Sequence, residues 1–93
     1  MRDIARMFAA MVTADHLLRV VDAYREAHRV SDPRVSTMMF NDGKRIGLLR
    51  KGGDIGSRSL VIAFQWLSDH WPAGAVWPDD VPRPARTEPE VAA

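Results

Sequence analysis

Three consecutive residues, Ser31, Asp32 and Pro33, constrain the fold of this chain more than any other feature of its sequence. A serine hydroxyl can cap the first turn of a helix, and an acidic residue suits the positive end of the helix dipole. Proline fits the first turn because its missing N–H needs no partner there. We therefore expect a helix to begin here. The turn signature at residues 41–43, Asn-Asp-Gly, predicts that this helix is short and ends at about Phe40.

Two amphipathic helices are predicted before this point. Over residues 2–12 apolar side chains recur at spacings of three and four, which places them on one helix face. These residues are Ile4, Met7, Phe8, Met11 and Val12. Thr13 can cap a second helix, with Asp15 in its first turn. The apolar stripe expected to be buried on this second helix consists of Leu17, Val20, Val21, Tyr24 and Ala27.

A fourth, short helix is predicted over residues 44–51. Ile46, Leu48 and Leu49 would point partly inward, and the glycines at 52 and 53 would cap the C-terminal end. An alternative interpretation stays open. Residues 35–40 and 44–49 could form two strands joined at the same turn, because short apolar runs are ambiguous between helix and strand.

A fifth, longer helix is predicted to begin with Ser57 or Ser59 as its cap and to end before Pro72 and Gly74. Its expected apolar face consists of Leu60, Ala63, Phe64, Leu67 and Trp71. We expect Trp71 and Trp77 to fold back on the core. Beyond Trp77 the chain is rich in proline and charge, and such a composition predicts a flexible tail over residues 78–93.

These elements predict an all-α fold, a compact bundle of about five helices with a helix-turn-helix and a disordered C-terminal tail. With 93 residues and 46% hydrophobic content, we expect one domain over residues 1–77, with an N-terminal amphipathic helix at 1–12 and a core at 14–71. The chain has no cysteine, and no apolar stretch reaches the roughly 18 residues that span a bilayer. Together with the lack of a signal-peptide pattern, this predicts a cytoplasmic protein with no membrane partner.

Positive charge is concentrated in residues 34–58. Against two acidic residues, Asp42 and Asp54, this segment carries six basic ones, a net charge of +4 in a chain whose total is +1. The six are Arg34, Lys44, Arg45, Arg50, Lys51 and Arg58. A basic helix can enter the major groove of DNA, where side chains reach base edges and neighbouring cations hold phosphates. These six residues are the predicted DNA-binding residues.

Four segments carry a resemblance to a known family: residues 31–36, 41–44, 48–53 and the capped helix 57–71. They resemble the lambda-repressor-like helix-turn-helix family, and most of all the short regulators of prophages and mobile elements in bacteria. The resemblance implies a supporting helix over residues 31–40, with Ser36 where the two helices cross closely. It also implies a recognition helix over residues 43–52.

The resemblance implies that four residues contact DNA: Lys44, Arg45, Arg50 and Lys51. It also implies repressor or activator activity, and binding as a homodimer to a palindromic site. A second alignment stays open, in which residues 30–44 are the recognition segment. The DNA contacts would then come from Arg34, Ser36 and Thr37.

Signatures of catalysis and of cofactor binding are missing from the sequence. The histidines His16, His28 and His70 have no metal-ligand spacing, and the chain contains neither a phosphate-binding glycine loop nor a nucleophilic serine motif. We therefore expect no enzyme activity, no metal and no cofactor. A protein-binding regulator on a helix-turn-helix scaffold, similar to an antiactivator or antitoxin-like adaptor, is the alternative function, since methionine pairs such as Met7 and Met11 suit adaptable binding surfaces.

Overall fold

The computed structural model describes residues 2–87, with their side chains from residue 7 onward. This part of the chain folds into five helices and contains no strand. The helices are α1 (Arg2–Met11), α2 (Ala14–His28), α3 (Asp32–Phe40), α4 (Arg45–Arg50) and α5 (Ser57–Asp69). The all-α prediction is therefore confirmed. The hairpin alternative is wrong, because both of its expected strands lie in helices.

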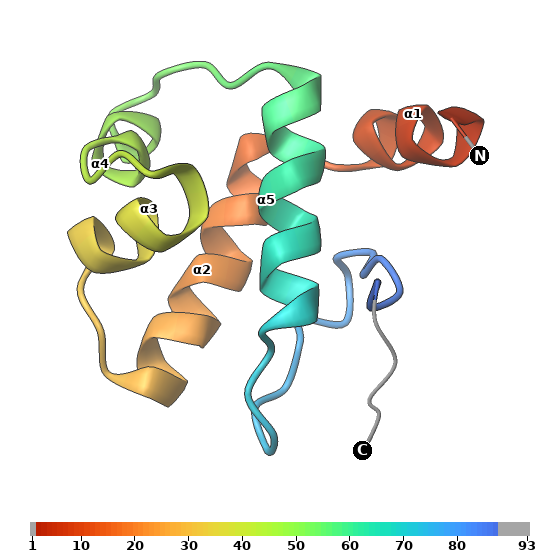
Figure 1. Cartoon of the computed structure of the whole chain (residues 1–93). Coiled ribbons are helices and arrows are strands. Elements are labelled where there is room, and N and C mark those ends of the chain that lie inside the picture. Colours follow the sequence, from red (N-terminus) through yellow and green to blue (C-terminus); the bar gives the residue numbers. More distant parts are fainter. Residues whose placement is uncertain (1, 88–93) are drawn as a thin grey trace.

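In the arrangement of the helices, α5 stands at the centre (Figure 1). The short helices α3 and α4 lie on one side of α5, whereas α1 and the C-terminal segment lie on the other. Because α5 packs against α1, α2 and α3, its long apolar face organises the whole core. Fully buried side chains come from α2, α3, α4 and α5, and the largest are Leu17, Ile46, Phe64 and Leu67.

Two of the three predicted N-terminal caps are present in the structure. The Thr13 hydroxyl accepts the backbone N–H of His16 at 3.2 Å, and the Ser31 hydroxyl accepts that of Arg34 at 3.3 Å. Both caps are confirmed. The predicted serine cap of α5 is wrong: Gly56 is the cap residue, and its carbonyl accepts the N–H of Leu60 at 2.9 Å. Extended backbone at Gly56 places Ser57 inside the helix as its first residue.

Two residues predicted to point inward are exposed. Ala27 lies in the last turn of α2, where the chain leaves the core toward α3. Leu48 is 54% exposed, because the six residues of α4 bury only Ile46 and Leu49. Sequence periodicity alone did not show which apolar residue of such a short helix faces solvent.

The end of α4 is closed by the two predicted glycines. Gly52 has a positive φ of 97°, and its N–H donates to the Leu49 carbonyl at 3.0 Å. The Gly53 N–H donates to the Leu48 carbonyl at 2.9 Å, and a Cβ atom on Gly53 would lie 2.9 Å from the same oxygen. The predicted glycine cap is confirmed, and each glycine has its own steric reason.

The N-terminal helix α1 packs on α5 through one face. The rings of Phe8 and Phe64 meet edge to face with their centroids 5.2 Å apart, and Val12 is buried. Met7 and Met11, predicted on the same apolar face, are exposed. The side chain of Ile4 lies outside those described. Among the side chains that the structure describes, the apolar face of α1 is therefore only partly covered.

The segment after α5 is held more firmly than its composition suggests. Trp71 is buried and Trp77 is half-buried, which confirms that both fold back on the core. The Trp77 indole N–H donates to the carbonyl of the buried residue Val81 at 2.9 Å. The Ser68 hydroxyl donates to the Pro84 carbonyl at 2.5 Å. Residues 78–87 therefore differ from the expected flexible tail, and residues 88–93 lie outside the described part of the chain.

The physical reason for this difference is a set of hydrogen bonds from side chains of α5 to backbone carbonyls of the segment. The Ser68 hydroxyl donates to the Pro84 carbonyl, and the Gln65 amide donates to the Ala85 carbonyl at 2.8 Å. The prediction of a flexible tail rests only on the small content of apolar side chains, which takes no account of these hydrogen bonds. None of the helices within residues 2–87 is long and apolar enough to cross a membrane.

The buried Ser68 hydroxyl gives a direct test of this docking. We expect Ser68→Ala to lower the free energy of unfolding by about 1–3 kcal/mol, because it leaves the partly buried Pro84 carbonyl and Arg83 guanidinium without the hydroxyl that pairs with both. Urea denaturation would measure this loss, and Trp77 fluorescence would report on the segment itself. Ser59→Ala, at a half-buried position of the same helix, is the matched control. Equal stability of the two variants would contradict the docked arrangement.

Candidate nucleic-acid interface

The two short helices α3 and α4 are joined by a sharp reversal of the chain. Asn41 ends α3 in the left-handed region with a φ of 59°, which asparagine tolerates better than most residues, and its N–H donates to the Thr37 carbonyl at 2.8 Å. The Asp42 carboxylate then accepts the N–H of Lys44 at 2.9 Å. These local bonds turn the chain between Phe40 and Arg45.

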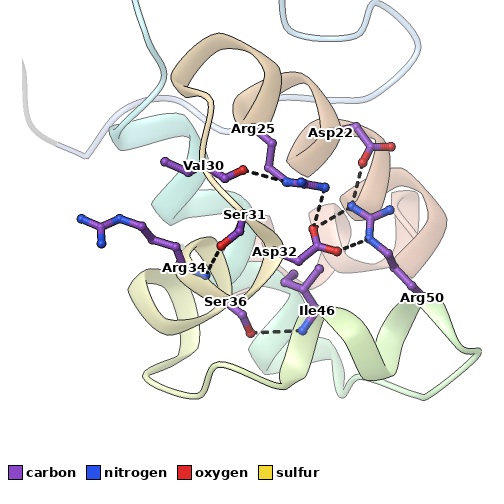
Figure 2. A network of polar contacts seen from close by, with 9 residues as sticks. All are labelled: Asp22, Arg25, Val30, Ser31, Asp32, Arg34, Ser36, Ile46 and Arg50. Carbon is purple, nitrogen blue, oxygen red and sulfur yellow. Dashed lines mark hydrogen bonds and ion pairs between the residues drawn. The ribbon is translucent and has the colours of Figure 1, made fainter.

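Ser36 connects α3 to both the turn and α4. Its side chain is fully buried, and its hydroxyl donates to the Asp42 carbonyl at 2.5 Å. The same hydroxyl accepts the N–H of Ile46 at 3.1 Å (Figure 2). A hydroxyl on a small side chain can make both bonds only if the helices approach closely. Ser36 therefore cannot contact a partner, which removes it from the alternative set of DNA contacts at Arg34, Ser36 and Thr37.

An ion-pair network attaches the other end of α4. The Arg50 guanidinium donates to both oxygens of Asp32, at 2.8 and 3.1 Å, and to Asp22 at 2.7 Å (Figure 2). Arg25 pairs with the same Asp32 carboxylate at 3.1 Å and donates to the Val30 carbonyl at 2.9 Å. The network thus joins α2, α3 and α4 through side chains that are far apart in sequence.

Electrostatics within the network favour the charged forms. The hydrogen bond from Arg50 lowers the pKa of Asp32 below its ordinary value, although partial burial acts in the opposite direction. The same bond from Asp32 raises the pKa of Arg50. Arg50, a predicted DNA-binding residue, is therefore a charged group with a 30% exposed side chain that pairs with two carboxylates. Its charge is largely balanced within the protein.

Two lysines lie on the side of α4 that faces away from the protein. Lys44 and Lys51, which flank the helix as its cap residues, are both exposed. They lie four residues before and three residues after Leu48, so the three side chains share one face. We call Lys44, Gly47, Leu48 and Lys51 the outward face of α4. Arg45 lies beside this face with its guanidinium carbon 5.0 Å from the centre of the Phe40 ring.

The other two predicted DNA-binding residues belong to neighbouring helices. Arg34 is exposed on α3 and points away from the ion-pair network (Figure 2). Arg58 is exposed as the second residue of α5. The structure therefore places Lys44, Arg45 and Lys51 on or beside α4, pairs Arg50 with two carboxylates, and leaves the last two cations on separate helices.

Sequence reasoning did not find the partners of Arg50. The sequence patterns indicate Asp32 only as a residue favourable at a helix start, and they single out no role for Asp22. The separations of 18 and 28 residues carry no periodic signal that would connect them to Arg50. Across residues 7–87, whose side chains are described, no three histidine or acidic side chains gather as a metal site.

Comparison of the chain with family models, with curated proteins and with solved structures finds no match.

The Ser36 bonds predict a clear stability effect. We expect Ser36→Ala to cost about 1–3 kcal/mol of unfolding free energy, because the buried N–H of Ile46 loses its acceptor. Thermal and urea denaturation would measure this cost. Thr37→Ala is the matched control, since the exposed Thr37 hydroxyl donates to the Pro33 carbonyl within α3. If Thr37→Ala were the more destabilising variant, the bridging role of Ser36 would be wrong.

The Asp32–Arg50 pair predicts a pH effect. Because the folded protein lowers the pKa of Asp32 from 3.8, the pair stabilises the fold above about pH 4, and this stability is lost as the pH falls through the lowered pKa. At pH 7 we expect Arg50→Ala to cost about 1 kcal/mol, a modest value because the pair is partly solvated. It should also reduce the loss of stability in acid.

Urea denaturation at several pH values would measure both effects. Arg34→Ala removes the same charge from an exposed position of α3 and serves as the control. If Asp32→Asn lost as much unfolding free energy at low pH as the wild-type protein, the pair would not contribute to the acid sensitivity.

Proposed function

We propose that the protein is a sequence-specific, DNA-binding transcriptional regulator that places the outward face of α4 in the major groove. The observation that carries this proposal is the division of the cations on and around α4. Arg50 fastens the helix to the protein, whereas Lys44 and Lys51 remain exposed at its two ends. A helix that is anchored on one side and basic on the other suits docking to a phosphate-lined groove.

The dimensions of α4 support the same conclusion. Seven residues at a rise of 1.5 Å separate Lys44 from Lys51 by about 10 Å along the helix. The major groove is about 12 Å wide, so both ammonium groups can reach phosphates while the residues between them face base edges. Because Ser36 and Arg50 already hold α4 in place, binding would cost little ordering of the helix.

The proposal includes a homodimer acting on a palindromic site, because two copies related by a two-fold axis would double a contact surface that is small in one copy. It places the protein in the cytoplasm, with DNA as its partner and with no enzyme activity or cofactor. Arg34, Arg45 and Arg58 would contribute phosphate contacts around the central pair of lysines.

A protein-binding regulator is the second candidate, and the exposed part of α1 favours it. Met7 and Met11 are 62% and 57% exposed one helical turn apart, and α1 lies on the side of α5 away from α3 and α4 (Figure 1). Flexible thioethers suit adaptable apolar contacts. In that case Met7→Lys and Met11→Lys would abolish function, while changes at Lys44 and Lys51 would be tolerated.

Selection from a random double-stranded DNA library at two salt concentrations tests the proposal. We expect a short, palindromic sequence to be enriched and its affinity to fall steeply with salt, because bound cations displace counterions from phosphates. Lys44→Ala and Lys51→Ala should each weaken binding and lower the slope of log affinity against log salt by about one.

Arg19→Ala provides the matched control, because Arg19 pairs with Asp80 in the C-terminal segment and its loss changes the net charge equally. If the folded protein retained no preferred sequence, specific DNA binding would be ruled out and the protein-binding function favoured. If Arg19→Ala weakened binding as much as Lys51→Ala, net charge rather than α4 would explain the affinity.

A further inference from the structure

We infer that Leu48 reads the 5-methyl group of thymine in the bound site, and that Gly47 lets the backbone of α4 approach the bases. This inference rests on the proposed DNA-binding function and names the bases that the outward face of α4 would recognise. It assigns roles to two residues that neither the core nor the turn requires.

Leu48 does not serve the core. Its neighbours Ile46 and Leu49 are buried, whereas Leu48 is 54% exposed at the middle of the outward face. An exposed leucine by itself is ordinary. Here it lies between two exposed lysines on a helix of six residues, so any partner held by these lysines would meet the leucine side chain.

Gly47 is a second and independent observation. A Cβ atom built on Gly47 would meet no atom within 4 Å, and its φ is not among the positive ones. Neither packing nor backbone conformation therefore requires glycine at this position. Alanine would favour the helix by roughly 1 kcal/mol, so the fold by itself favours another residue. Glycine in such a place suits close approach of the backbone to a ligand.

Charge complementarity selects DNA as the occupant of this surface. A partner that meets Lys44 and Lys51 must present negative groups about 10 Å apart, with an apolar group between them to cover Leu48. The major groove offers phosphates at its edges and one apolar feature on its floor, the methyl group of thymine. The outward face of α4 thus matches a thymine-containing groove in both charge and polarity.

The test compares thymine with uracil, which lacks only this methyl group. The probe is the duplex enriched from the random library, synthesised with each thymine replaced in turn by uracil. At one position or more we expect affinity to fall about fourfold, the effect of one buried methyl group. Leu48→Ala should remove this difference while leaving the salt dependence unchanged. Lys51→Ala should keep the difference while reducing the salt dependence.

Gly47→Ala gives the second arm. We expect this variant to unfold at a higher temperature than the wild-type protein and yet to bind the same duplex at least tenfold more weakly. Circular dichroism would confirm that each variant is folded. Unchanged affinity in Gly47→Ala would overturn the role of Gly47.

Different outcomes overturn the proposed DNA-binding function and the inference about Leu48. If the wild-type protein binds a preferred duplex but does not distinguish thymine from uracil, the inference about Leu48 is overturned and the proposed function stands. The same holds if Leu48→Ala leaves the thymine preference intact. If no preferred duplex is retained, both the proposed function and this inference are overturned.

Discussion

The hydrogen bonds of the Ser36 hydroxyl are the interaction on which the arrangement of α3 and α4 depends. A helix of six residues has little stability of its own, because the cost of nucleation is spread over very few hydrogen bonds. Ser36 supplies an acceptor for the N–H of Ile46 in the first turn of α4 and a donor for the turn before it. The burial of Ile46 and Leu49 then holds the inner face of the helix.

The ion pairs of Arg50 complete this attachment and change how the basic segment should be understood. A count of charges treats all six cations of residues 34–58 alike. In the folded protein Arg50 is balanced by Asp22 and Asp32, both of which lie outside that segment. The positive charge available to a partner therefore comes from the other cations, and above all from Lys44 and Lys51 at the ends of α4.

The opposite side of α5 has a different character. It is covered by α1 through Phe8 and by residues 78–87, whose carbonyls are bound by side chains of α5 such as Ser68. Within residues 2–87, neither α1 nor the C-terminal segment lies beside α4 (Figure 1). The exposed methionines of α1 are the only large apolar side chains of that helix, among those described, that the rest of the chain leaves uncovered. The helices α1 and α4 therefore lie on opposite sides of α5 (Figure 1).

The sequence by itself determined the local structure: the helical class, the caps at Thr13 and Ser31, the turn after Phe40 and the glycine cap of α4. Each of these depends on interactions within about four residues, which leave a readable pattern. Only the tertiary structure decided that Arg50 pairs with Asp22 and Asp32, that Leu48 faces outward, and that residues 78–87 dock on α5. These features depend on contacts between residues far apart in the chain, where spacing carries no signal and the packing of neighbouring helices sets which side chains meet.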